Sequence, residues 1–220
     1  MYLDVNIQKV FHSKHHHFEL NVRFQSDSQR IVIFGASGSG KSLTLKAIAG
    51  LIKIDQGHIK LDSETLTDTT QHIHRTPQQR NLAYLFQDYA LFPHLTVRQN
   101  ISFGLTKSWL NPAINKRFDA VDYWLDAFDL KALSHQLPEQ LSGGQRQRTA
   151  LARALVAKPK ALLLDEPFTA LDANLRQVMR QELDKLQQQL QVPMIMITHD
   201  PEDTAIFGQH VLTIKNGSLQ

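Results

Sequence analysis

The stretch that decides the fold is Gly35-Ala36-Ser37-Gly38-Ser39-Gly40-Lys41-Ser42, which matches the phosphate-binding pattern G-x-x-x-x-G-K-[ST] at every defined position. The four apolar residues before it, 31–34, suit a buried parallel strand. Residues 43–49 then predict a helix that Gly50 ends. This order of strand, glycine-rich turn and helix is the context that the pattern requires, so the sequence predicts an α/β fold built around a phosphate-binding loop.

The residue types of this stretch explain the chemistry. Its three glycines let the backbone turn tightly and bring amide N–H groups close to phosphate oxygens, and the helix N-terminus adds a partial positive charge. Lys41 can neutralise terminal phosphates, and the Ser42 hydroxyl can ligate Mg²⁺. The alternative, a surface loop whose glycines only serve a turn, is disfavoured by the complete pattern. The sequence therefore predicts binding of a nucleoside triphosphate with Mg²⁺.

Composition sets outer limits on the function. The chain has 220 residues, 42% hydrophobic and 20% charged, with a formal net charge of +3. This is typical of one globular domain, and the mild positive surplus gives no reason to expect nucleic-acid binding. The sequence has no cysteine, which excludes disulfides and thiolate metal sites. Its apolar runs are shorter than the roughly 18 residues of a membrane span. A role at a membrane is therefore expected to require binding to a partner protein there.

The regions flanking the loop are less distinctive. Residues 1–24 alternate loosely and predict two strands of a half-exposed sheet. Between them, His15-His16-His17 suggests either a metal site or a solvated loop, and the loop is favoured because adjacent histidines cannot easily face one ion. Residues 65–79 are polar and predict an exposed loop. The apolar run 81–86 ends at Gln87, and periodicity alone favours a glutamine that merely ends a strand.

From about residue 88 to residue 158 the pattern becomes helical, and no convincing strand follows until Ala161. Within this lobe lies Leu141-Ser142-Gly143-Gly144-Gln145. Ser142 and Gln145 have capping-box spacing, and the two glycines favour close approach of another group, for which an anion is the natural candidate. The sequence thus predicts a second phosphate-binding helix end, unless Ser142 is only an N-cap.

Two further strands end in chemically useful residues. The apolar run 161–164 predicts a buried strand that delivers Asp165 and Glu166 to its carboxyl end. Asp165 suits Mg²⁺ through a bound water, and Glu166 suits orienting or deprotonating an attacking water; a surface acidic pair is the alternative. The strand predicted over 194–198 ends at His199, where contact with a γ-phosphate and a packed surface histidine are equally compatible with the pattern.

In this order the pieces resemble the ATPase subunits of ATP-binding cassette (ABC) transporters over essentially the whole chain. The resemblance assigns Walker A to 35–42, the Q-loop to Gln87, the Walker B strand to 162–165, the catalytic carboxylate to Glu166, the D-loop to 170–172 and the switch histidine to His199. It implies a P-loop NTPase (RecA-like) α/β core, residues 1–88 and 159–220, with an N-terminal antiparallel β subdomain and an inserted helical subdomain, residues 89–158.

The resemblance also implies a mechanism, in which a head-to-tail homodimer closes on two Mg-ATP before hydrolysis. ATP would be bound by the 35–42 loop, by Leu43, and by Ser142, Gly143, Gly144 and Gln145 of the other subunit. The catalytic residues would be Glu166, His199, Gln87 and Lys41. The Mg²⁺ ligands would be Ser42, Gln87 and Asp165. Leu43 departs from the commoner threonine, and the adenine-stacking residue is left open among Phe11, His12, His15, His16 and His17.

Residues 87–97 resemble the importer branch, and 76–80 resemble the ATPases of molybdate importers most. This implies docking of membrane permease subunits near Gln87–Arg98, an indirect solute-binding protein, and a place at the cytoplasmic face of the membrane. The molybdate ATPases usually carry a C-terminal regulatory domain, so ending at Gln220 implies that it is absent or cut off. Alternatives are importers of iron, sugars or polyamines, a soluble ABC ATPase of DNA repair or translation, and a non-hydrolysing regulatory module.

Overall fold

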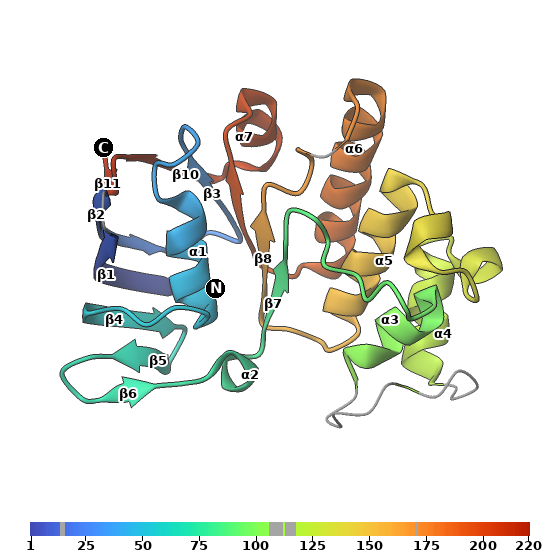
Figure 1. Ribbon diagram of the computed structural model, residues 1–220, viewed down its shortest axis with the longest axis horizontal. Helices are drawn as coiled ribbons and strands as arrows, with labels where there is room; N and C mark the ends of the chain where they lie inside the picture. Colours follow the sequence, from blue (N-terminus) through green and yellow to red (C-terminus); the bar gives the residue numbers. More distant parts are fainter. Residues whose placement is uncertain (14–15, 106–111, 113–117, 170) are drawn as a thin grey trace.

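The computed structural model describes residues 1–220 except 14–15, 106–111, 113–117 and 170 (Figure 1). Its strands join one sheet in the order β6-β5-β4-β1-β2-β11-β10-β3-β9-β8-β7. The strands are β1 (Leu3–Ser13), β2 (His16–Ser26), β3 (Arg30–Phe34), β4 (Gln56–Leu61), β5 (Glu64–Asp68), β6 (Ile73–His74), β7 (Leu82–Leu85), β8 (Ala161–Asp165), β9 (Met194–Thr198), β10 (His210–Lys215) and β11 (Ser218–Leu219). The helices are α1 (Lys41–Ala49), α2 (Pro77–Arg80), α3 (Val97–Phe103), α4 (Asp119–Ala127), α5 (Gly143–Leu155), α6 (Ala173–Leu190) and α7 (Pro201–Phe207), with 3-10 turns η1 (Lys131–Leu133) and η2 (Pro138–Gln140).

The sheet has an antiparallel half and a parallel half. Strands β6, β5, β4, β1 and β2 pair antiparallel, and β1 alternates buried apolar with more exposed residues, as a sheet with one covered face requires. Strands β10, β3, β9, β8 and β7 are mutually parallel. Every residue of β8 and β9 is buried, which explains why these strands read as continuous apolar runs.

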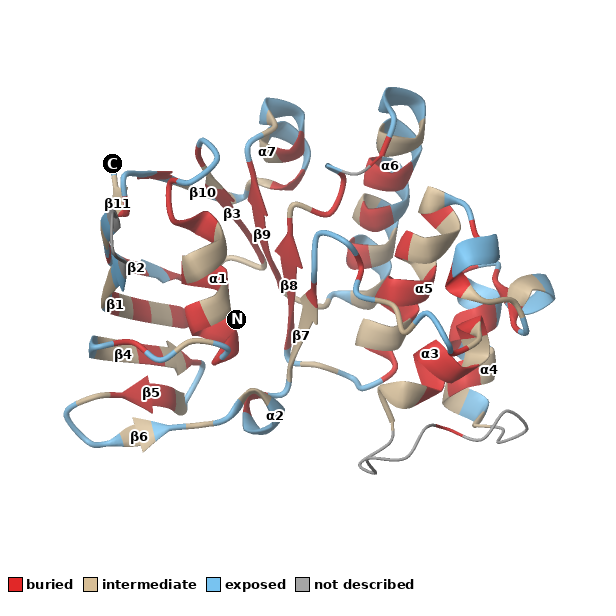
Figure 2. Cartoon of the chain, viewed as in Figure 1, coloured by how far each residue is buried: buried red, intermediate tan, exposed pale blue. Residues whose placement is uncertain are grey.

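Helices cover the two faces of the parallel half separately. Because side chains alternate along a strand, Leu163, Ile195 and Ile197 pack into the core beneath α1. Their neighbours Leu162 and Met196 pack instead into the core shared with α3, α4, α5 and α6. Figure 1 shows α3, α4 and α5 gathered at the end of the molecule opposite to β1, β2 and β4, and Figure 2 shows buried residues on the sides of these helices that face one another. The α/β P-loop fold with an antiparallel β region is confirmed, whereas a separate helical subdomain at 89–158 stays a prediction.

Two local predictions are wrong. Residues 65–79 are not one exposed loop, because β5 pairs with β4, β6 pairs with β5, and a helical turn follows as α2. Leu66, Thr67 and Asp68 are buried as a result. The histidines 16 and 17 likewise belong to β2, opposite Ser13 and His12, because the β1–β2 ladder continues to that point; His15 lies outside the described residues.

In the part of the chain that the structure describes, no helix combines the length and the apolar character that a membrane crossing requires.

Candidate nucleotide site

The loop between β3 and α1 is shaped by its glycines and held by Lys41. Gly40 occupies the N-cap of α1 with a φ of 109°, in the left-handed region that favours glycine. A side chain at Gly35 would place its Cβ 2.4 Å from the carbonyl oxygen of Ile214 on β10, so that position has room only for glycine. The ammonium of Lys41, 3% exposed, donates to the carbonyl oxygens of Gly35 and Ala36 at 2.8 and 2.9 Å. The loop therefore has a fixed backbone with a cation at its base.

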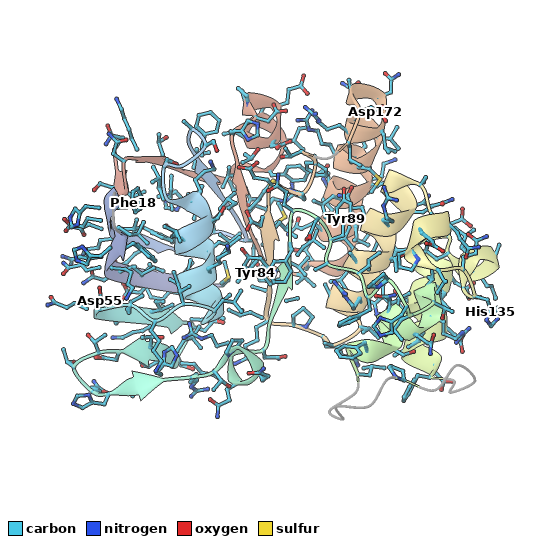
Figure 3. All side chains as sticks on the ribbon, in the orientation of Figure 1. Phe18, Asp55, Tyr84, Tyr89, His135 and Asp172 are labelled. Atoms are coloured by element: carbon cyan, nitrogen blue, oxygen red, sulfur yellow. The ribbon has the colours of Figure 1, made fainter. Side chains whose placement is uncertain are left out.

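Asp165, the last residue of β8, faces the start of α1. One carboxylate oxygen accepts a hydrogen bond from the Ser42 hydroxyl at 3.1 Å, and the other accepts from the Tyr84 hydroxyl at 2.6 Å. Tyr84 lies on the neighbouring strand β7, and burial together with the bond to Asp165 raises the pKa of its phenol. Tyr84 is thus a donor that sequence reasoning missed, because its partner is distant along the chain (Figure 3).

Glu166 links the loop to the end of β9. Its carboxylate lies 3.5 Å from the Lys41 ammonium and 3.2 Å from Nδ1 of His199, and it accepts from the Thr169 hydroxyl at 3.2 Å. The backbone of Glu166 has a φ of 47°, a conformation sparsely populated by residues other than glycine and characteristic of functional sites. The structure therefore brings Lys41, Glu166 and His199 together at the carboxyl ends of β8 and β9.

Lys41 and Glu166 line a pocket at the carboxyl edge of the parallel strands, where open α/β sheets bind ligands, and Asp165 and His199 contact lining residues from beside it. Its lining is Ser37, Gly38, Gly40, Lys41, Ser42, Leu43, Gln87 and Glu166. Backbone N–H groups at the helix start and a buried ammonium suit a polyphosphate. The Ser42 hydroxyl, the Asp165 carboxylate and the Gln87 amide offer the oxygen ligands that Mg²⁺ prefers, so the residues fit ATP with Mg²⁺.

The capping box predicted at Ser142 and Gln145 is present at the start of α5, which lies apart from this pocket, and phosphate binding there stays a prediction. Ser142 caps α5 by accepting from the Gln145 amide at 3.3 Å, while the Gln145 side chain accepts from the Ser142 amide at 2.8 Å. A Cβ on Gly144 would lie 3.1 Å from Leu175 of α6. Close packing of α5 against α6 therefore explains why glycine stands at this position, and the sequence alone did not show this contact. None of the described signature residues lines the pocket, and α1 and α5 pack into different cores.

An aromatic residue that packs against the loop, Phe18, is not one of the five candidates for adenine stacking. Phe18 on β2 lies 3.2 Å from where a Cβ on Gly40 would stand, and its ring centroid is 6.4 Å from that of Phe11. Among the candidates, Phe11, His12 and His17 lie on the β1–β2 hairpin. His15 and the side chain of His16 lie outside the described residues.

Comparison with known proteins agrees with this geometry. Residues 19–169 match the family model described as ABC transporter, which covers more than half of the chain. The chain belongs to the ABC transporter family. It is 43% identical to the sulfate/thiosulfate import ATP-binding protein CysA of Synechocystis, over 88% of this chain and 52% of that protein. It is 41% identical to a probable CysA of Chlorella vulgaris, over 97% of this chain and 87% of that protein.

A third relative, the molybdenum import ATP-binding protein ModC of Rhizobium etli, is 36% identical over 92% of this chain and 56% of its own length. The chain thus spans about half the length of most of the curated relatives that it matches. The fold is that of the ATP-binding cassette MJ0796, whose dimeric structure bound to ADP and Pi matches with a TM-score of 0.80 at 28% identity, over 100% of this chain and 97% of that one.

Proposed function

We propose that this chain is the ATP-hydrolysing subunit of an ABC importer. The observation that carries the proposal is the convergence of Lys41, Asp165 and Glu166 at the carboxyl ends of adjacent parallel strands. A buried cation, a Mg²⁺-type carboxylate and a second carboxylate one residue further on are the parts that phosphoryl transfer to water requires. The ABC importer ATPases among its relatives support the same reading.

Each residue of the pocket has a distinct task. The amides of the 35–42 loop and Lys41 would bind the terminal phosphates, and Ser42, Gln87 and the neighbouring Asp165 would hold Mg²⁺, which would neutralise charge on the phosphates. Glu166 orients the attacking water and accepts its proton. The His199 imidazole, already 3.2 Å from Glu166, steadies charge that develops on the transferred phosphoryl group.

The complete site is formed between two copies of the chain. Because Ser142, Gly143, Gly144 and Gln145 stand outside the loop pocket of their own chain, they close the ATP site of a partner. A dimer is also the form in which the matching cassette MJ0796 was solved with ADP and Pi, and this supports a dimer of the present chain.

The segment Gln87–Arg98 docks membrane permease subunits at the cytoplasmic face. Arg153 of α5 supports this proposal, because its guanidinium donates to the carbonyl oxygens of Tyr89 and Ala90 at 2.7 Å each and lies over the Phe92 ring at 5.5 Å. The segment is therefore tied to the helix that begins at the signature, so a docked permease can act on both. A solute-binding protein takes part only through the permease.

For the solute we propose an oxyanion. Relatives named for sulfate and thiosulfate, at 43% and 41% identity, favour that anion over molybdate, whose named relative is 36% identical. Relatives named for Fe³⁺ ions and for oligosaccharides match at 42% and 41%, and they define the competing solutes. The proposed solute is therefore a tetrahedral oxyanion, with sulfate or thiosulfate ahead of molybdate.

Phosphate release from ATP by the purified chain tests the activity. We expect release that requires Mg²⁺ and is abolished by Lys41→Ala, with Lys131→Ala, an exposed lysine on η1, as the matched control. Release unaffected by Lys41→Ala would contradict the proposal.

The solute is tested by co-purifying the chain with its permease and reconstituting the complex. Sulfate, molybdate, Fe³⁺ and a sugar are then added one at a time, and only the transported solute should stimulate ATP hydrolysis. Recovery with ribosomes or DNA would overturn the transport role and leave the ATPase chemistry standing.

A further inference from the structure

Two imidazoles meet at the end of the β1–β2 hairpin, outside the nucleotide pocket. His12 on β1 stands directly opposite His17 on β2 in the antiparallel register. Their Nδ1 atoms are 3.3 Å apart, and their ring centroids are 4.9 Å apart with an interplanar angle of 44°. Both residues are exposed, so the facing nitrogens are open to solvent ions.

The separation of the two nitrogens suits two ligands of one metal ion. Tetrahedral Zn²⁺ with Zn–N bonds of about 2.0–2.1 Å holds two ligand nitrogens about 3.3–3.4 Å apart. Without an ion, the 3.3 Å contact is a long hydrogen bond in which one Nδ1 donates and the other accepts, and the tautomers set the roles. An ion replaces this hydrogen bond without moving the rings, because both nitrogens already lie at the required spacing.

The charged groups nearest to the pair balance each other. Asp55 accepts hydrogen bonds from the Lys9 ammonium at 2.6 Å and from the Val10 amide at 2.9 Å, which fixes its carboxylate beside β1. The bond from Lys9 is the main reason that the pKa of Asp55 is lowered, and His12 is close enough to contribute a smaller lowering. The proposal therefore rests on the two imidazole nitrogens and not on a surplus of negative charge around them.

The type of ligand decides which cation fits. Imidazole nitrogen suits Zn²⁺, Cu²⁺ and Ni²⁺, whereas Mg²⁺ and Ca²⁺ require oxygen ligands. The described residues contain no group of three or more metal-ligating side chains, so water must complete the coordination. Mg²⁺ at the nucleotide pocket and an ion at this hairpin would therefore not compete.

We propose that His12 and His17 bind one divalent transition-metal ion, Zn²⁺ being the reference case, through their Nδ1 atoms. The ion joins β1 to β2 near the end of the hairpin where β1 finishes and β2 begins. The site lies next to the nucleotide loop, because Phe18, the residue after His17, packs against Gly40. Binding to the folded chain alone would also raise its thermal stability, by an amount that grows with the logarithm of the metal concentration above the Kd.

Calorimetric titration of ZnCl₂ into metal-free, tag-free protein tests the site. We expect one ion per chain, an affinity about tenfold or more weaker in both His12→Ala and His17→Ala, and an unchanged affinity in His135→Ala, an exposed histidine on the helical side of the molecule (Figure 3). Millimolar Mg²⁺ should not displace the ion. In ¹⁵N spectra of the imidazoles, Zn²⁺ should shift the Nδ1 resonances of His12 and His17.

Three results would overturn the site. The first is Zn²⁺ affinity that His12→Ala and His17→Ala leave intact. The second is binding lost only in a His15→Ala/His16→Ala variant. The third is a shared proton between the two Nδ1 atoms in the spectra with no Zn²⁺ response. All these readouts are independent of ATP, so failure of the metal site and failure of the proposed ATPase function are distinguishable.

Discussion

Each carboxylate oxygen of Asp165 has its own donor, Ser42 from the loop and Tyr84 from the adjacent strand. Tyr84→Phe removes one donor and leaves a partly buried carboxylate oxygen without a partner. We expect the free energy of unfolding to fall by about 1–2 kcal/mol, since a short bond to a charged group is lost. We also expect the Mg²⁺ concentration for half-maximal ATP hydrolysis to rise several-fold, because the carboxylate is no longer held in one orientation.

Urea denaturation and Mg²⁺ titration of the ATPase rate measure the two effects. Tyr123→Phe is the matched control, because the Tyr123 side chain is 59% exposed and lies on α4, away from the pocket. If Tyr84→Phe behaves like Tyr123→Phe in both assays, Tyr84 does not position Asp165.

At the scale of elements, the C-terminus of α1 depends on Arg80, the last residue of α2 and the residue after the region predicted as a loop. The Arg80 guanidinium, 1% exposed, donates to the carbonyl oxygens of Ala47 and Ile48 and to the Thr67 hydroxyl. Burial lowers the pKa of Arg80 to about 10, so the group stays charged at neutral pH. Arg80→Met should lower the free energy of unfolding by about 2–4 kcal/mol, because the last carbonyls of the helix lose their donors.

Urea denaturation at pH 7 checks this, with the exposed Arg23→Met as the control. A loss below about 0.5 kcal/mol, the usual range for surface substitutions, would mean that water replaces the guanidinium at the helix end.

Helices α6 and α7 are joined by ion pairs beside His199. The Arg180 guanidinium, 2% exposed, donates to Asp200 at 2.5 Å and to Asp203 at 2.6 Å, and Asp203 accepts from the Thr198 hydroxyl at 2.5 Å. Partial burial pushes the pKa of Asp200 up, but hydrogen bonds from the Glu202 amide and from Arg180 outweigh it, so this pKa lies below its ordinary value. The stabilisation is therefore present above the unfolded pKa of about 3.9 and is lost as the pH falls through the folded value.

Asp200→Asn isolates that charge, because asparagine keeps the N-cap of α7. At pH 7 we expect a loss of about 1–2 kcal/mol in the free energy of unfolding, and we expect the variant and the parent to converge as the pH falls below the folded pKa of Asp200. Urea denaturation at several pH values gives the comparison. A difference that stays constant with pH would show that the Asp200 charge contributes nothing.

The elements that the sequence predicted well are those that local patterns define. The strands before the loop and before Asp165 are continuous apolar runs, and the cap at Ser142 is a short-range pattern. β5 was missed because its polar threonines pair at the sheet margin, where neither face gives a clear period. Tyr84 and Arg80 were missed because their partners lie 81 and 13 to 33 residues away, and only the folded chain brings them together.

At the scale of the whole molecule, a single chain separates the two helix ends that we propose to bind phosphate, since α1 packs into one core and α5 into the other. If each ATP site takes the loop of one chain and the signature of its partner, two defective chains can repair each other. Lys41→Ala damages the loop, and Ser142→Asp keeps the α5 cap while placing a negative charge where phosphate would bind. Each variant alone should hydrolyse ATP at a background rate.

Mixing the two variants in equal amounts should restore activity. Half of the dimers would be mixed, and each mixed dimer would have one intact site of its two, so up to about a quarter of the parent rate is expected from symmetry. Phosphate release as a function of mixing ratio measures this, and a mixture of Lys41→Ala with the doubly substituted chain is the control that should stay at background. A mixture no faster than its components would contradict the shared site, because a site formed within one chain gains nothing from a partner.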